Sequence, residues 1–353
     1  MNWFNRKQKS VLCIDISSVA VKLLEISKAN NSYTIEKFIT VPLSLKTPAD
    51  INSSNTPEIT EALHAALTTT KTSLKHATIA VSPSSVITKI ITMPAFLTEA
   101  QIEEQIMIDA DQYVPYAIDD LFFDFEILGV NQKNSDLVDV LFVASRRSNV
   151  DERVSALTNV GLKTDIVDVE TFAMENAMSL LPNYSDQPLT EQTIALVNIG
   201  ASFSSLTVLH NGRIEYTREQ EFGGKQLTEK IQYQYGISFN EAELKKIEGG
   251  LPSSYIEDIL EPFKSAMSQQ IQRSIQLYNS SAGNRDINYL MLCGGCASII
   301  DIDKYIERTL KIPVYIANPL INMSLSNKIE LNALYKQAPS LMVACGLAIR
   351  SFD

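Results

Sequence analysis

The sequence has little of what marks several large classes of protein. No apolar run approaches the roughly 18 residues that a membrane-spanning helix needs. The first ten residues include Arg6, Lys7 and Lys9, but no apolar segment follows them, so a signal peptide is not expected. With 30 Lys and Arg against 41 Asp and Glu, the net charge is −11. This balance argues against a nucleic-acid binder, because no basic excess exists to neutralise phosphates.

Cysteine and histidine are also scarce, with four and three residues among 353. Without a signal peptide, this usage indicates a reducing compartment. Cys293 and Cys296 have C-x-x-C spacing, but the apolar Leu290–Leu292 run places Cys293 at the end of a strand. A redox site favours a helix N-terminus, and a zinc site needs two more ligands at metal spacing. Two small buried residues are therefore favoured over a redox or metal site.

One pattern occurs twice in the chain. Residues 11–22 form an apolar run that ends in Asp15, a turn of small residues, and a second apolar run. Residues 195–206 repeat this arrangement 183 positions later, with Asn198 in the place of Asp15. Each copy is typical of strand, tight turn, strand, and the two turns predict a clamp whose backbone N–H groups hold a phosphate chain.

The length predicts two domains. Each repeat is expected to open a three-stranded antiparallel meander, and the polar, proline-bounded segment 182–188 is expected to link the domains. We expect domain I over residues 1–188, domain II over 189–337, and a C-terminal helix, 338–353, that packs back on domain I. The order of elements in about 84–165 predicts an inserted ferredoxin-like βαββαβ subdomain. Its first helix, begun by Thr98 and Gln101 as a capping box, should run to about Tyr113. The residues expected to face inward are Ile102, Ile106, Met107 and Ala110.

The paired turns and two Gly-Gly sites resemble the superfamily of actin, the heat-shock chaperones and the sugar kinases. Segment 292–295 (Leu-Cys-Gly-Gly) is similar to the adenosine motif of that superfamily, and segments 167–173 and 344–346 are similar to its two connecting segments. The resemblance implies an α/β, actin-like fold of two duplicated domains that close on ATP.

Within that superfamily, nearly the whole chain resembles the PilM family of type IV pilus assembly proteins. The most specific segments are Tyr-Val-Pro-Tyr at 113–116, Asp-Val-Glu at 168–170 and 222–228 (Phe-Gly-Gly-Lys-Gln-Leu-Thr). The resemblance implies a cytoplasmic scaffold, peripheral at the inner membrane, that binds the cytoplasmic N-terminal peptide of PilN. It also implies contacts with other proteins of the assembly platform, and a homo-oligomer is an open alternative.

The same resemblance assigns candidate site residues. Those for ATP or ADP are Asp15, Ser17, Ser18, Lys22, Asn198, Gly200, Ala201, Ser202, Gly223, Gly224, Lys225, Glu243, Lys245, Gly294, Gly295 and Cys296. Asp15 would hold Mg²⁺ through water. Tyr113, Pro115 and Tyr116 are candidates for lining a peptide groove, with core packing under a helix end as the alternative. For Lys22 the alternative is a solvated strand residue, and for Glu243 and Lys245 it is an exposed helix face.

Two departures from the resemblance bear on catalysis. Ser17 stands where the first loop often has Gly, and Asn198 brings no charge where Asp is common. No motif supplies a catalytic base, so at most a weak ATPase is expected. Two alternatives remain open. An FtsA-like filament-forming membrane ATPase would need an amphipathic helix, and the sequence after Arg350 shows none. A small-molecule kinase would need a base to activate a substrate hydroxyl.

Overall fold

The first half of the chain supplies five strands of a six-stranded sheet, and residues 324–325 supply the sixth. The computed structural model describes residues 9–30, 32–43, 56–184, 188, 191–281, 285–326, 329 and 331–352. The strand order is β14-β3-β2-β1-β4-β8. These strands are β1 (Lys9–Ile16), β2 (Ala20–Ala29), β3 (Ser32–Pro42), β4 (His76–Val81), β8 (Lys163–Val169) and β14 (Ser324–Leu325). The antiparallel meander of β1, β2 and β3 is confirmed, and β4 and β8 extend it in parallel.

Both faces of this sheet are covered by helices. Leu12 and Ile14 on β1 point toward α1 (Thr56–Thr70) and α4 (Arg147–Asn159). Cys13 between them points toward α5 (Glu170–Ala177) and α11 (Met342–Phe352). Successive side chains of a strand alternate between its faces, so a strand that is buried on both sides must be apolar throughout. The apolar run that ends at Asp15 therefore reflects the central place of β1.

Domain II is a five-stranded sheet in the order β11-β10-β9-β12-β13. Its strands are β9 (Thr193–Ile199), β10 (Ser204–His210), β11 (Arg213–Gln220), β12 (Tyr289–Cys293) and β13 (Val314–Ile316). The accompanying helices are α6 (Gly224–Tyr235), α7 (Phe239–Glu248), α8 (Glu261–Ser281) and α9 (Ile302–Leu310), with α10 (Leu331–Gln337) leading to the C-terminus. Asn211 and Gly212, both at positive φ, form the hairpin turn expected from the sequence.

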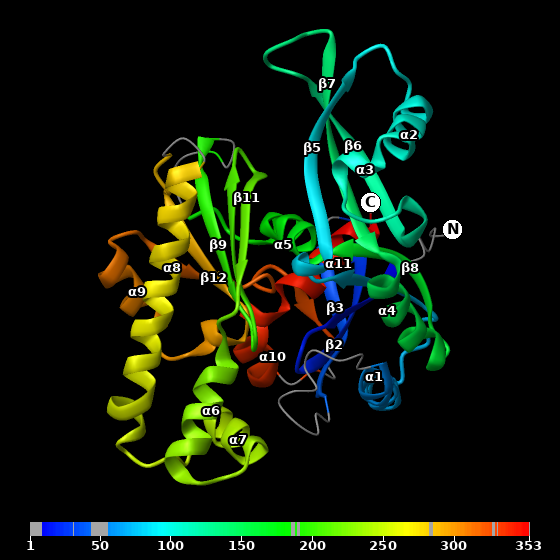
Figure 1. Cartoon of the computed structure of the whole chain (residues 1–353). Helices are drawn as coiled ribbons and strands as arrows, with labels where there is room; N and C mark the ends of the chain where they lie inside the picture. Colours follow the sequence, from blue (N-terminus) through cyan, green and yellow to red (C-terminus); the bar gives the residue numbers. More distant parts are fainter. Residues whose placement is uncertain are drawn as a thin grey trace, which may run out of the picture.

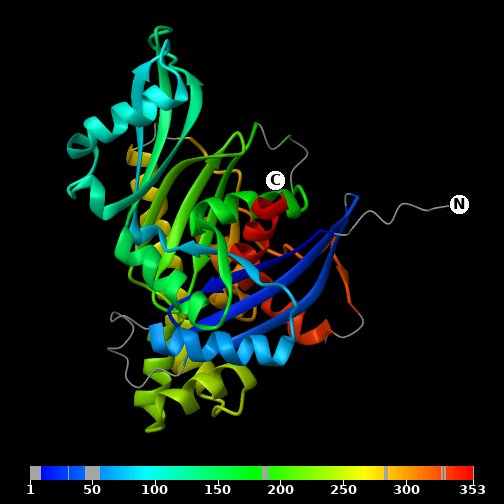
Figure 2. The ribbon, with the colours of Figure 1, turned by 90° about the vertical axis from the view of Figure 1, so that its right-hand side faces the viewer.

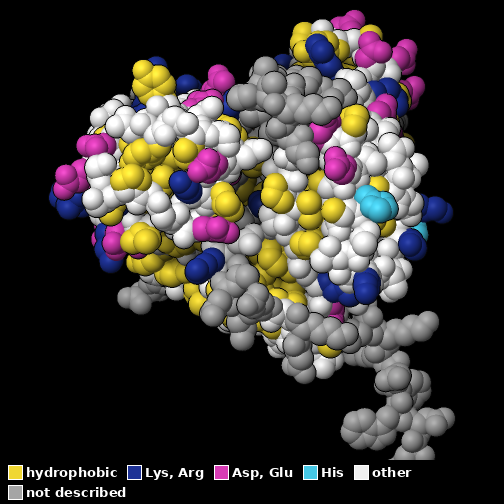
Figure 3. Space-filling model, turned by 90° about the horizontal axis from the view of Figure 1, so that it is seen from below, with side chains coloured by type: hydrophobic (Ala, Val, Ile, Leu, Met, Phe, Trp, Pro, Cys, Tyr) yellow, Lys and Arg dark blue, Asp and Glu magenta, His cyan; other side chains and the backbone are white. Residues whose placement is uncertain are grey.

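Two helices join the domains into one core. The helices α5 (Glu170–Ala177) and α11 (Met342–Phe352) lie between the two sheets (Figure 1). Cys13 and Leu24 of domain I share a buried cluster with these helices and with Leu196 and Met291 of domain II. A furrow separates the lobes when the molecule is seen from below, and hydrophobic side chains show along its wall (Figure 3). The two domains therefore share one packed core at α5 and α11.

The packing of α11 on α5 leaves no room at Gly346. A Cβ on this residue would lie 1.6 Å from the backbone carbonyl oxygen of Ala173. The helix also meets domain I at Ser351, whose Oγ lies 2.7 Å from Oγ1 of Thr78. The small residues of the C-terminal segment thus permit close helix–helix contact, and α11 also contacts β1, β2 and β4.

The internal duplication is confirmed by the strand register. Asp15 lies opposite Lys22 in the β1–β2 ladder, and Asn198 lies opposite Ser205 in the β9–β10 ladder. Each pair is separated from its counterpart by 183 positions. A parallel strand follows on the same side of each hairpin, β4 beside β1 and β12 beside β9. The two turns therefore occupy equivalent places in the two domains.

The inserted subdomain stands above domain I (Figures 1 and 2). Its sheet has three antiparallel strands in the order β5-β7-β6, namely β5 (Val86–Pro94), β6 (Leu121–Val130) and β7 (Leu137–Arg146). The expected four-stranded ferredoxin-like sheet is wrong, because β8 pairs with β4 of the large sheet and α4 packs on α1. The order β-α-β-β-α-β along the chain is the same in both cases. Sequence periodicity does not specify which edge the last strand joins.

The first helix of the insert is shorter than expected. The capping box of Thr98 and Gln101 is confirmed, but α2 (Glu99–Ile108) ends at Asp109 and the short α3 (Ala110–Tyr113) follows. The Asp109 carboxylate accepts hydrogen bonds from the side chains of Gln105 and Gln112, which stabilises this break. Ile102, Ile106 and Ala110 face inward as expected, whereas Met107 is 46% exposed and points outward. No helix in the described part of the chain has the length and hydropathy to span a membrane.

Candidate functional site

The first candidate phosphate loop is closed by Ser17. The amide of Ser17 donates to the carbonyl of Ala20 at 3.0 Å, and its hydroxyl donates to the same carbonyl at 2.9 Å. The Ser17 hydroxyl also accepts the amide of Ala20 at 3.1 Å. Neither Ser17 nor Ser18 has positive φ, so this loop does not need the Gly that the resemblance led us to expect. The hydroxyl of Ser17 supports the turn itself, and the adjacent Ser18 points out of it.

The second loop repeats the first in its hydrogen bonding. The amide of Gly200 donates to the carbonyl of Phe203 at 3.0 Å, the same bond that Ser17 and Ala20 make 183 positions earlier. The two loops meet through their hydroxyls, since Oγ of Ser18 lies 3.2 Å from Oγ of Ser202. The structure therefore brings together the two turns that the sequence predicts as a clamp.

The start of α6 packs directly on the second loop. A Cβ on Gly223 would lie 2.4 Å from the carbonyl oxygen of Ala201, so only Gly fits at this position. The amide of Gly224 donates to the carbonyl of Gly200 at 3.0 Å, and that of Lys225 donates to Ala201 at 2.8 Å. These two amides are therefore engaged by the carbonyls of the second loop. The pair Gly223-Gly224 allows α6 to approach that loop closely.

The second Gly-Gly site lies at the end of β12. Gly294 has φ of 84° and its Cβ would lie 2.4 Å from the carbonyl oxygen of Ile199, so both its conformation and its packing require Gly. Gly295 is exposed with open space above its Cα. The Cys296 thiol is buried 3.6 Å from the carbonyl oxygen of Gly200, and burial raises its pKa to about 11. A thiol with this pKa is protonated at neutral pH, which agrees with a packing role.

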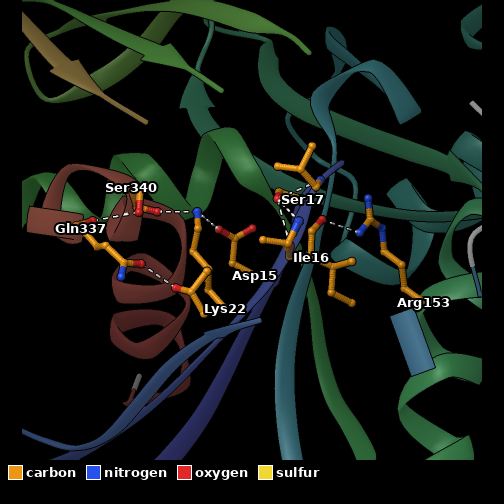
Figure 4. Close-up of polar contacts among 10 residues, drawn as sticks. Asp15, Ile16, Ser17, Lys22, Arg153, Gln337 and Ser340 are labelled. Atoms are coloured by element: carbon orange, nitrogen blue, oxygen red, sulfur yellow. Dashed lines mark hydrogen bonds and ion pairs between the residues drawn. The ribbon is translucent and has the colours of Figure 1, made fainter. Parts of the chain in front are cut away.

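Asp15 and Lys22 form an ion pair beside the first loop (Figure 4). Lys22 Nζ donates to Oδ2 of Asp15 at 2.9 Å and to the carbonyl oxygen of Ser340 at 2.7 Å. Only 15% of the Lys22 side chain is exposed, which excludes the alternative of a solvated strand residue. Lys22 thereby ties the loop to the segment that leads into α11. The carboxylate of Asp15 fits the outer hydration shell of Mg²⁺, but it shares its charge with Lys22.

One carboxyl group that sequence reasoning missed, that of Glu170, lies beside this pair, and a second, that of Glu219, lies near Glu170. Glu170 opens α5, and burial together with the charge of Asp15 raises its pKa to about 7. The Glu219 carboxylate on β11 raises it further, while Arg153 and Lys22 lower it. Burial raises the pKa of Glu219, and the nearby Ser84 of domain I lowers it in part. The Asp-Val-Glu segment was recognised in the sequence, but its glutamate was not assigned to the site.

Arg153 of α4 is a second residue that the sequence did not single out. Its Nη1 donates to the carbonyl oxygen of Ile16 at 3.0 Å, one residue before Ser17 (Figure 4). The Arg153 side chain approaches the loop from the side opposite Lys22 and Ser340. The periodicity of α4 predicts its apolar face only, so it gives no signal for this contact.

The helix α7 contributes one of the two charged residues expected from it. Glu243 accepts hydrogen bonds from Lys246 at 2.6 Å and from Thr228 of α6 at 2.5 Å. Lys246 also reaches the Thr228 hydroxyl at 2.8 Å and lies close to Gly224. Lys245 instead pairs with Glu241 on an exposed face. The cluster beside α6 therefore contains Lys246, the next residue along, in place of Lys245.

The three candidate peptide residues lie at the junction of α3 and β6. Tyr113 packs against Phe142 in the core of the insert, with ring centroids 5.8 Å apart. The ring of Tyr116 lies 3.8 Å from the guanidinium of Arg146, while Pro115 is exposed. Core packing thus accounts for Tyr113 and for part of Tyr116, which is half-buried against the core of the insert, whereas Pro115 lies at the surface.

Comparison with known proteins decides the family. Residues 13–352 match the family described as Type IV pilus assembly protein PilM. The chain belongs to the PilM family. A solved structure titled "PilM-PilN type IV pilus biogenesis complex" superposes with a TM-score of 0.79 at 22% identity, over 97% of this chain and 98% of that chain. The ethanolamine utilization protein EutJ from Carboxydothermus hydrogenoformans superposes with a TM-score of 0.56 at 13% identity, over 97% and 89% of the two chains. These likenesses confirm the α/β, actin-like fold that the sequence of this PilM family member implied.

Proposed function

We propose that this PilM family member is a nucleotide-binding scaffold of type IV pilus assembly. The observation that carries the proposal is the meeting of the two equivalent loops at Ser18 and Ser202. The amides of Ser18, Ala201 and Ser202 make no backbone hydrogen bond to another described residue. Backbone N–H groups of this kind form anion-binding concavities. ATP or ADP would place its phosphates between the loops, which requires the two serines to separate.

The remaining site residues fit the other parts of a nucleotide. The open space above Gly295 leaves room beside the adenosine motif, and Glu243 with Lys246 presents polar groups on the neighbouring α7. Mg²⁺ would be held through water near Asp15, where Asn198 across the cleft adds an acceptor without charge. Few carboxylates are placed to act on Mg²⁺ here, and that of Asp15 is already paired with Lys22. We therefore propose at most slow hydrolysis of ATP.

Titration calorimetry with ADP and ATP in the presence of Mg²⁺ tests the nucleotide site. Gly295→Leu fills the open space and should abolish binding while leaving the thermal midpoint unchanged. Ser253→Leu, at an exposed position of domain II, is the matched control and should bind like the wild type. Absence of heat from the wild type at millimolar nucleotide would refute the site.

We infer that the partner is the cytoplasmic N-terminal peptide of PilN, docked beside the inserted subdomain. The match to a PilM–PilN complex supports this inference. So does the exposure of large apolar side chains on the insert, because such residues are enriched where partners bind. They include Phe96 at 82%, Ile108 at 69% and Ile90 at 64%. The protein would then be cytoplasmic and held at the inner membrane through PilN, in contact with other platform proteins, and a homo-oligomer is compatible with this placement.

Fluorescence anisotropy of a labelled PilN peptide tests the partner. Tyr116→Ala should weaken binding, because it removes an aromatic surface and releases Arg146. The control is Tyr233→Ala on α6, whose side chain is 90% exposed and lies in the other domain. Equal affinities of the two variants would place the peptide elsewhere.

A further inference from the structure

Arg153 holds the first loop from outside the hairpin that forms it. Its guanidinium donates to the carbonyl of Ile16 at 3.0 Å, and the Ile16 side chain is buried. The opposite flank of the loop is held by Lys22, which belongs to the same β1–β2 hairpin. Arg153 belongs to α4, so any movement of α4 relative to β1 acts on the loop. The planar fork of a guanidinium fixes such a contact in both distance and angle.

The helix that carries Arg153 is a direct continuation of the insert. Strand β7 ends at Arg146 and α4 begins at Arg147 without an intervening loop. Arg146 stacks on Tyr116, while Arg147 donates to the carbonyl of Asp119 at 2.7 Å and lies 4.2 Å from the ring of Phe122. The first turn of α4 is thereby clamped to the surface of the insert where a peptide is proposed to dock. Arg153 lies about 10 Å further along the same helix.

The base of the insert also touches both domains. The carbonyl of Ser85, at the start of β5, accepts hydrogen bonds from Ser145 at 2.8 Å and from Asn149 of α4 at 3.3 Å. The neighbouring Ser84 lies close enough to Glu219 of domain II to lower the pKa of its carboxyl group. A movement of the insert is therefore expected to move α4 directly, and to affect domain II through Ser84. Packed elements and hydrogen-bond networks of this kind carry coupling between distant sites.

We propose that Arg153 positions the first loop for nucleotide and couples nucleotide affinity to occupancy of the insert by the partner peptide. This proposal rests on the proposed function, and it adds the role of Arg153 and the path from the insert through α4 to the first loop. A peptide that displaces Tyr116 or Phe122 shifts the first turn of α4, and Arg153 transmits the shift to the carbonyl of Ile16. Because coupling between two ligands is reciprocal, nucleotide changes peptide affinity by the same factor.

The test measures ADP affinity in the presence of Mg²⁺ with and without saturating PilN peptide. In the wild type, the two dissociation constants should differ by about fivefold or more, the usual scale of such coupling. In Arg153→Gln, ADP should bind more weakly on its own, because the loop loses this contact, and the constants with and without peptide should agree within about twofold. The peptide should still bind by itself. Arg153→Lys keeps the charge but loses the fork, and should give an intermediate ratio. If the variant still binds ADP and peptide but the ratio of its two ADP dissociation constants falls to one, the substitution has removed the coupling and has not simply unfolded the protein.

The matched control is Arg308→Gln, an exposed arginine on α9 that lies over Tyr305. It should keep the wild-type ratio. A wild-type ratio of one, or an unchanged ratio in Arg153→Gln, overturns the inference while leaving the proposed function in place. If Arg153→Gln fails to fold, Arg153→Lys decides, and a wild-type ratio in that variant overturns the inference. A wild type that binds ADP or peptide not at all overturns the proposed function, and the coupling with it.

Discussion

The hydroxyls of Ser18 and Ser202 lie 3.2 Å apart, although 184 residues separate them in the chain. Each belongs to the turn that follows the first strand of its domain, so the contact joins the equivalent turns of the two repeats, at positions one residue out of register. Phosphates bound between the loops would occupy this space. The proposed site therefore predicts that the distance between these two residues increases when nucleotide binds.

The first prediction uses this pair as a cross-link. With Ser18→Cys and Ser202→Cys combined, mild oxidation should join the loops in the absence of nucleotide, because cysteine closely replaces serine in size. ADP with Mg²⁺ should slow the cross-link, and the oxidised protein should lose ADP binding until it is reduced. Gel mobility and titration calorimetry measure the two effects. The single variants are the controls, and a cross-linking rate that ADP leaves unchanged would contradict this assignment.

The second prediction concerns the ion pair of Asp15 and Lys22. Lys22→Met leaves a carboxylate that is 6% exposed without its partner, and should lower the free energy of unfolding by about 2–4 kcal/mol. Adding Asp15→Asn removes the uncompensated charge and should recover part of the loss. Urea unfolding of the wild type, both single variants and the double variant gives the coupling directly. Additive losses would mean that the two groups do not interact.

The third prediction separates two glycines by their packing. Gly346→Ala forces a Cβ onto the carbonyl of Ala173 and should destabilise the protein by about 1–3 kcal/mol or more through overpacking. Gly295→Ala meets no atom within 4 Å and should leave the thermal midpoint unchanged. Equal thermal unfolding midpoints for the two variants would show that α11 can move away from α5 without loss of stability.

The fourth prediction is a pH dependence of stability that arises at Glu170. Its pKa of about 7 in the folded protein lies above the ordinary 4.5, so the folded state binds more protons than the unfolded state between these values. Stability should therefore fall as the pH rises from 4.5 to 7, by an amount on the order of 2 kcal/mol for this group. Glu170→Gln should flatten that part of the profile, as measured by urea unfolding at several pH values. The same slope in both proteins would assign it to other groups.

The fifth prediction compares neighbouring lysines on α7. Lys246 reaches Thr228 and Glu243 beside α6, whereas Lys245 pairs with Glu241 at the surface. Lys246→Met should weaken ADP binding severalfold, and Lys245→Met should not. Titration calorimetry with ADP on the two variants checks this prediction. A larger loss of ADP affinity in Lys245→Met would support the sequence-based expectation that Lys245 contacts the nucleotide.

The sequence alone determined the features that depend on local pattern. The 183-residue repeat, the hairpin at Asn211 and Gly212, and the capping box of Thr98 follow from periodicity and turn chemistry within a few residues. The family likewise followed from motifs spread along the whole chain. These signals are local or repeated, so they survive without knowledge of the fold.

Only the tertiary structure decided which distant groups meet. It placed β8 beside β4 in the large sheet, selected Lys246 over Lys245, and brought Glu170 toward Asp15. It also placed the guanidinium of Arg153, on the helix that follows the insert, against the carbonyl of Ile16 beside the first loop. Pairing of strand edges and burial of charge depend on the packing of segments far apart in the chain, and single-sequence periodicity contains neither.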